Sequence, residues 1–149
     1  MSSSRSLAAL VVIACCSGCA ERSSTQMAPS QVAGSPAPMA DQLSGTWSLV
    51  SIQPAGEADQ PTPPGASYTL TFADGRLSTR VDCNVCNGAF TLSGQTLTAG
   101  PALACTRAAC PTIAFENHYT ALLSGNSIVT LSTNVLALSS ARGVLRFTR

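Results

Sequence analysis

The chain from Arg80 to Phe90 reads Arg-Val-Asp-Cys-Asn-Val-Cys-Asn-Gly-Ala-Phe, and a second pair of cysteines, Cys105 and Cys110, follows it. Two segments that run antiparallel bring the outer cysteines together and the inner cysteines together. Because the cysteines of each pair are an odd number of residues apart, an extended chain points them to opposite faces. We therefore expect two nested disulfides, Cys83 with Cys110 and Cys86 with Cys105.

Two other chemistries use cysteines at similar spacings. The pattern C-x2-C-x18-C-x4-C comes near a zinc ribbon, in which two tight turns supply thiolates to tetrahedral zinc, although the second pair has four intervening residues. A Cys-x-x-Cys pair can also be a dithiol redox centre when its first thiolate lies at a helix N-terminus, but we expect no helix to begin at Cys83. The compartment decides among the three, because thiols pair in an oxidising environment.

The beginning of the chain resembles a secretory signal. A short polar segment with Arg5 precedes the apolar run from Leu7 to Ala14. Val-Ile-Ala followed by Cys15 resembles the lipobox of bacterial lipoproteins, so we expect residues 1–14 to be the signal and Cys15 to be lipidated. Cys19 is the alternative site, with residues 1–18 as the signal. An ordinary cleaved signal and a secreted product is the other alternative.

Lipidation would anchor the mature protein to a membrane, because each buried lipid methylene contributes about 0.8 kcal/mol. The residues after the two candidate cysteines are Cys16 and Ala20, and neither is the aspartate that resemblance to other lipoproteins associates with inner-membrane retention. We therefore expect a place in the bacterial cell envelope, at the outer membrane facing the periplasm. That compartment is oxidising, which favours two disulfides over a metal site or a reactive dithiol.

The rest of the chain divides into a tether and one domain. Residues 15–42 are rich in Ser, Ala, Pro, Gln and Met without an apolar period, which predicts a flexible tether. The folded domain is expected at 43–149. From Asp41 onward the chain has as many arginines as acidic residues and no lysine, so nucleic acid is not an expected partner.

Alternating apolar segments separated by turn residues predict short antiparallel strands. The strongest hairpin signal is Asp74-Gly75, because a type I′ turn needs positive φ at both central residues. Gly88 is expected to interrupt a strand, and the proline-rich residues 53–66 and residues 99–109 are expected to be irregular. The expected strands are 47–52, 67–72, 76–81, 89–92, 95–98, 127–132, 135–139 and 144–148.

One helix is expected at about residues 111–123. Pro111 suits a first helical turn, where its missing amide hydrogen is not needed. Its apolar stripe consists of Phe115, Tyr119, Leu122 and Leu123. The fold class is therefore α+β and rich in β structure: a strongly curved antiparallel sheet or small barrel of about eight short strands with this helix packed on it.

Several motifs resemble, in their order and spacing, the META domain of HslJ-like bacterial lipoproteins, over residues 43–149. The matching residues include the signature positions Asn84, Gly88, Thr106, Arg107 and Glu116. Asp82 stands where that family usually has glycine, and Cys86 and Cys105 are additional to its pattern. The motifs are Leu43-Ser44-Gly45-Thr46-Trp47-Ser48-Leu49, Cys83-Asn84 with Gly88 and Phe90, Thr106-Arg107-Ala108-Ala109-Cys110-Pro111, and Glu116 ahead of Leu122.

The resemblance implies an envelope protein linked to heat shock and to novobiocin tolerance, without an established reaction or catalytic residues. We expect a non-enzymatic lipoprotein without cofactor or metal, which acts through contacts with an unidentified envelope protein. For the signature residues we expect structural roles, with Asn84 and Gly88 in a tight turn or bulge and Arg107 paired with Glu116. The alternative is that Asn84, Thr106 and Arg107 line a recognition surface.

A lipocalin-like carrier of a small apolar ligand is the alternative function. Gly45-Thr46-Trp47 resembles the lipocalin Gly-x-Trp signature, in which a late arginine, here Arg146, would cover the tryptophan. The domain is short for eight long strands around a cavity, and an interior filled by side chains would exclude this function. The one histidine, His118, is not expected to be catalytic. No phosphate loop, serine elbow or His-Glu-x-x-His motif occurs.

Overall fold

The computed structural model of the protein describes residues 38–149. The predicted signal, the candidate lipidation sites Cys15 and Cys19 and most of the predicted tether lie outside the described residues. The strands are β1 (Gly45–Pro54), β2 (Gln60–Pro61), β3 (Tyr68–Ala73), β4 (Arg76–Val81), β5 (Asn84–Ser93), β6 (Thr96–Ala99), β7 (Ala104–Cys105), β8 (Gly125–Ser132), β9 (Val135–Ser140) and β10 (Gly143–Thr148), and the helices are α1 (Met39–Leu43) and α2 (Ile113–Leu123).

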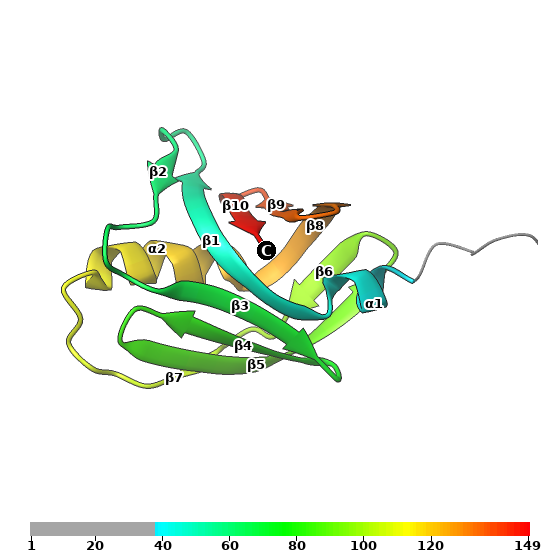
Figure 1. The fold of residues 1–149 in the computed structure, drawn as a ribbon, viewed down its shortest axis with the longest axis horizontal. Helices are drawn as coiled ribbons and strands as arrows, with labels where there is room; N and C mark the ends of the chain where they lie inside the picture. Colours follow the sequence, from blue (N-terminus) through cyan, green and yellow to red (C-terminus); the bar gives the residue numbers. More distant parts are fainter. Residues whose placement is uncertain (1–37) are drawn as a thin grey trace, which may run out of the picture. The chain divides into compact units, whose positions relative to one another are not determined.

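Eight antiparallel strands of the domain close into a barrel (Figure 1). Their order is β1-β3-β4-β5-β6-β8-β9-β10, and β10 pairs with β1 to complete the circle. The two remaining strands are short: β2 pairs with β1, and β7 pairs with β5. The predicted small barrel with one packed helix is confirmed, and closure leaves the main strands without a free edge.

Helix α2 packs against β1 and β10 with the predicted apolar stripe. Tyr119, Leu122 and Leu123 are buried, and Phe115 is partly buried. The hydroxyl groups of Tyr119 and Thr79 share a hydrogen bond of 2.7 Å. Burial raises the pKa of Tyr119 well above its ordinary value. This one polar contact satisfies the hydroxyl group inside an otherwise apolar interface.

Several local predictions hold and others need correction. The Asp74-Gly75 hairpin is confirmed, with φ values of 49° and 71°. Strand β1 contains a bulge between Leu49 and Ser51, so Leu49 and Ile52, three residues apart, lie opposite the buried residues Phe147 and Leu145 of β10. The predicted loop 53–66 contains β2, and helix α1, which was not predicted, lies partly within the predicted tether.

The most informative correction concerns Gly88. It does not interrupt a strand, because β5 continues through it and pairs it with Leu77. A Cβ atom at position 88 would lie 2.7 Å from Leu103 Cδ2. The glycine is therefore needed for the close approach of Leu103, and a turn is not the reason for it.

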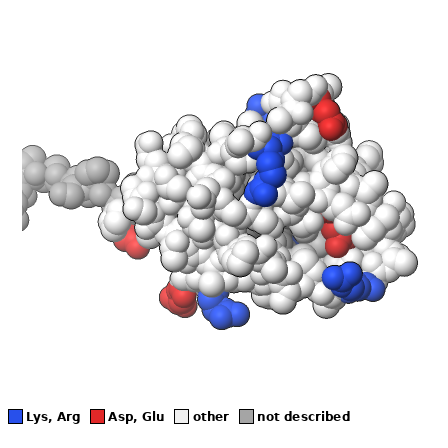
Figure 2. Space-filling model, turned by 180° about the vertical axis from the view of Figure 1, so that it is seen from behind, with Lys and Arg blue, Asp and Glu red and all other residues white. Residues whose placement is uncertain are grey.

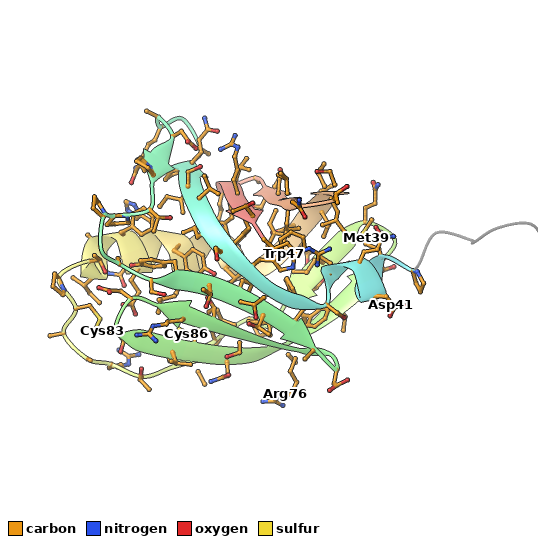
Figure 3. The ribbon with its side chains drawn as sticks, viewed as in Figure 1. Met39, Asp41, Trp47, Arg76, Cys83 and Cys86 are labelled. Atoms are coloured by element: carbon orange, nitrogen blue, oxygen red, sulfur yellow. A yellow bond between two sulfur atoms is a disulfide. The ribbon has the colours of Figure 1, made fainter. Side chains whose placement is uncertain are left out.

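The interior of the barrel is filled by side chains (Figure 3). Trp47 is fully buried, and its Nε1 donates to Leu43 O at 2.8 Å. The cation over the tryptophan ring is Arg149, at 4.2 Å from the ring centroid, whereas Arg146 pairs with Asp59 at 2.7 Å. The prediction that Arg146 covers Trp47 is therefore wrong, and the filled interior argues against a carrier of apolar ligands.

Neither helix within residues 38–149 has the length and hydropathy needed to cross a lipid bilayer.

Candidate functional site

Two disulfides join residues 105–110, which comprise the end of β7 and part of the loop before α2, to β5 and the turn that precedes it. They connect Cys83 with Cys110 and Cys86 with Cys105, with Cα–Cα distances of 5.9 and 4.0 Å. The nested pairing predicted from the spacing is confirmed. Cys86 and Cys105 are opposite each other in the β5–β7 pairing. Figure 3 marks Cys83 and Cys86 close together near one end of the barrel, yet each is bonded to a partner in the other segment.

Asn84 holds the same loop through its side-chain amide. Its Oδ1 accepts hydrogen bonds from the backbone N–H of Ala108 at 2.7 Å and from Thr106 Oγ1 at 3.0 Å. Its Nδ2 donates to Ala108 O and to Glu116 Oε2, both at 3.0 Å. Asn84 is only 1% exposed. Since a buried amide needs all its partners, this side chain specifies the path of residues 106–108.

We expected Asn84 to lie within a tight turn or bulge, but the turn consists of residues 82–83 and Asn84 follows it. Asn84 is the first residue of β5 and pairs with Val81, while Asp82 has a φ of 59°. The META resemblance places glycine at position 82, and a left-handed φ explains that preference. Aspartate is among the few other residues that tolerate this conformation. Here Asp82 Oδ2 also accepts a hydrogen bond from Thr112 Oγ1 at 2.7 Å.

Thr112 extends this contact toward the barrel wall. Its hydroxyl accepts a hydrogen bond from the Tyr68 hydroxyl at 3.0 Å. Burial raises the pKa of Tyr68. The residues Asp82, Thr112 and Tyr68 thus join β3, the turn before β5 and the start of α2. These linked hydrogen bonds could not be predicted from the sequence, because no local pattern connects three positions that are so far apart along the polypeptide.

Glu116 is a buried carboxylate on the first turn of α2. It is 6% exposed, and its oxygens accept hydrogen bonds from Asn84 Nδ2 at 3.0 and 3.3 Å. The predicted ion pair with Arg107 does not form: within residues 38–149 the ion pairs consist of Arg146 with Asp59. Asn84 takes the place expected for Arg107, whose exposed side chain makes no hydrogen bond to the described residues.

These residues surround a pocket of about 410 Å³. Asn84 and Glu116 line it together with Thr106 and Arg107, so the structure brings four of the five signature residues to one place. Gly88 lies nearby and makes room for Leu103, which is another lining residue. The pocket therefore combines a buried acidic group, an exposed basic group and apolar side chains.

Charge is otherwise sparse on the domain. Figure 2 shows the charged side chains scattered over one face, without a patch of a single sign. No group of three or more potential metal ligands occurs within residues 38–149. A general electrostatic attraction to a polyanion is not supported by this distribution.

The comparisons with known proteins agree with this architecture. The sequence pattern of the META domain matches residues 40–149. No protein of curated function matches the chain. A similar solved structure is the NMR structure of a protein from Burkholderia xenovorans, with a TM-score of 0.62 and 25% identity over 82% of this chain and 96% of that one.

Two further solved structures are similar. A second protein studied by NMR has a TM-score of 0.58 and 26% identity, over 73% of this chain and 92% of its own. The crystal structure of a duf4847 family protein from Bacteroides vulgatus ATCC 8482 has a TM-score of 0.54 and 18% identity, over 71% and 92% of the two chains. At that identity the likeness concerns the fold alone.

Proposed function

This chain belongs to the META domain family, and from that premise we propose that it is a non-enzymatic lipoprotein of the bacterial cell envelope. It acts in stress or antibiotic tolerance through contacts with another envelope protein. The observation that carries the proposal is the pair of disulfides within the domain. Such bonds persist in oxidising compartments such as the periplasm and are rare in the bacterial cytosol.

The anchor rests on the first residues of the chain. The apolar run and the lipobox-like residues before Cys15 support lipidation there, with Cys19 as the alternative. A triacylated cysteine would hold the domain at the outer membrane, facing the periplasm, because several acyl chains give stable anchoring. The domain would then meet its partner while remaining attached to the membrane.

A role in contacts, rather than in catalysis or transport, is supported by the interior and by the cysteines. Trp47, Tyr119 and the other core side chains are buried in the interior, where a carrier would hold its ligand. All four domain cysteines are bridged, so none offers a thiolate for dithiol exchange. The lone histidine, His118, is exposed on α2.

The anchor is tested by mass spectrometry of the N-terminal peptide from membranes. We expect the acyl chains on Cys15 in the wild type and in Cys19→Ser, and their loss in Cys15→Ser. These two variants control for each other, because both remove one thiol near the same position. An acylated Cys19 in the wild type would transfer the proposal to the alternative site, and an unmodified N-terminus would refute the anchor.

The role is tested in a strain that lacks the protein. We expect reduced survival in novobiocin and after heat shock, restored by the wild type and not by a variant without the lipidated cysteine. Cross-linking through photoreactive residues on the exposed face of the barrel should capture one envelope protein. Unchanged tolerance in the deletion strain would refute the role in stress, whatever the state of the anchor.

A further inference from the structure

Glu116 is a buried acidic group without a cation. Its side chain is 94% removed from solvent, since the residue is 6% exposed, and no arginine or histidine of residues 38–149 pairs with it. A buried carboxylate is costly unless it is paired or fully hydrogen-bonded. Glu116 is a lining residue of the pocket described above, so a ligand in that pocket would lie beside it.

The carboxylate also has unused capacity for hydrogen bonds. Its two oxygens offer about four acceptor positions. Within the described residues, the donor that reaches them is Asn84 Nδ2, at 3.0 and 3.3 Å. A primary ammonium group carries a positive charge and three donors on one atom, so it matches both the charge and the empty acceptor positions.

Arg107 supplies the opposite charge on the same pocket. Its side chain is exposed and makes no hydrogen bond or ion pair with residues 38–149. Guanidinium groups bind carboxylates through two parallel hydrogen bonds. The pocket therefore presents Glu116 as an acceptor for a cation and Arg107 as a donor for a carboxylate. These two side chains do not form an ion pair with each other.

The walls of the pocket are held in place by covalent bonds. Cys105 lines the pocket and is bonded to Cys86, and Asn84 fixes the backbone of Ala108 on both its N–H and its C=O. A site whose lining is held by packing and second contacts binds with little loss of conformational entropy. The volume of about 410 Å³ lies within the range of small-ligand sites.

We propose that this pocket binds a small zwitterion, with its ammonium group on Glu116 and its carboxylate on Arg107. Leu103 and Ile113 provide apolar contacts for a short side chain between the two charged ends. The chemical class is a free amino acid or a short peptide, since both carry these two groups. The inference does not depend on the lipid anchor or on the partner proposed above.

The test is calorimetric titration of the full chain in detergent micelles with four probes. Alanine and alanylalanine carry both charged groups, N-acetylalanine lacks the ammonium and alaninamide lacks the carboxylate. We expect saturable binding of alanine or alanylalanine, and binding at least tenfold weaker for each probe that lacks one charge. Tighter binding of alanine would identify the ligand as a free amino acid, and tighter binding of alanylalanine would identify it as a short peptide.

Two variants assign the charged groups. Glu116→Gln keeps the size of the side chain and should weaken binding of the zwitterion at least tenfold. It should not further weaken binding of N-acetylalanine, which has no ammonium group. Arg107→Ala should weaken binding of the zwitterion by a similar factor without further weakening binding of alaninamide, which has no carboxylate. Arg76→Ala is the matched control, because Arg76 is also exposed and unpaired within the described residues but does not line this pocket.

The proposal has clear points of failure. No saturable heat with either zwitterion would overturn it, and so would equal binding of alanine and N-acetylalanine. If Glu116→Gln fails to fold, the four probes and Arg107→Ala still decide the question. Equal affinity of Arg107→Ala and Arg76→Ala for the zwitterion would contradict the role of Arg107.

Discussion

Replacing Asn84 with alanine should destabilise the domain strongly. The substitution removes the amide that satisfies both backbone groups of Ala108 and the carboxylate of Glu116, with heavy-atom distances between 2.7 and 3.0 Å. It leaves Glu116 buried without its donor. The loop between the disulfides would also lose the contacts that set its path.

The magnitude follows from these contacts. The bond to the Glu116 carboxylate is charge-assisted, and such bonds contribute about 1.5–3 kcal/mol. The two bonds to Ala108 contribute about 0.5–1.5 kcal/mol each, with the lower value expected because water can replace them at this exposed residue. We expect a total loss of about 3 kcal/mol, which corresponds to a fall in Tm of roughly 10–15 °C for a domain of this size.

Urea unfolding followed by circular dichroism measures the change. The matched control is Asn87→Ala, because Asn87 lies on the same strand, is exposed and makes no side-chain hydrogen bond within the described residues. For Asn84→Ala we expect the urea midpoint to fall while the slope of unfolding free energy against urea concentration stays unchanged. For the control we expect the free energy of unfolding to stay within about 0.5 kcal/mol of the wild type. A loss below 1 kcal/mol for Asn84→Ala, or equal losses for both variants, would refute the assignment of Asn84 as the residue that holds the loop.

Three further predictions test the fold. Changing Cys83 and Cys110 together to alanine removes a closure with a sequence separation of 27 and should cost up to about 3.6 kcal/mol by urea unfolding; no loss would show that the bridge does not constrain the unfolded chain. Gly143→Ala should lower the Tm far more than Gly75→Ala, because a Cβ atom at position 143 meets the backbone of β1 whereas position 75 faces open space, and equal effects would contradict this. Since burial raises the pKa of Tyr119, its contribution to stability is complete below the ordinary tyrosine pKa of 10.0 and is lost as the pH rises above it. Tyr119→Phe should therefore flatten the fall in unfolding free energy between pH 9 and 11, and an unchanged slope would argue against the buried hydroxyl.

The sequence predicted much of the fold because its signals are local. Alternation of apolar residues located most of the strands, and the strand expected at 76–81 matches β4. The turn at Asp74-Gly75 follows from the φ values that a type I′ turn requires. The errors fall where a local signal has two readings. The glycine at position 88 predicts a break in the strand, but in the structure Gly88 makes room for Leu103, which is distant in the sequence.

The candidate site could be predicted only in part. The resemblance supplied Asn84, Thr106, Arg107 and Glu116, which do line one pocket. Their roles were not predicted, because which donor reaches a carboxylate depends on distances between separate segments. Asn84 rather than Arg107 binds Glu116 within the described residues, and this leaves the arginine available for a ligand.

The sequence by itself determined the nested disulfides, the antiparallel β-rich class and the helix stripe. Antiparallel segments and fixed periods of 2 and 3.6 residues are properties of the chain's local geometry. Only the tertiary structure decided that β10 closes the barrel on β1, that Arg149 and not Arg146 covers Trp47, and that Glu116 lacks a cation. Those outcomes depend on the positions of side chains that meet only after the barrel has closed, because contact between distant segments is set by packing and not by sequence spacing.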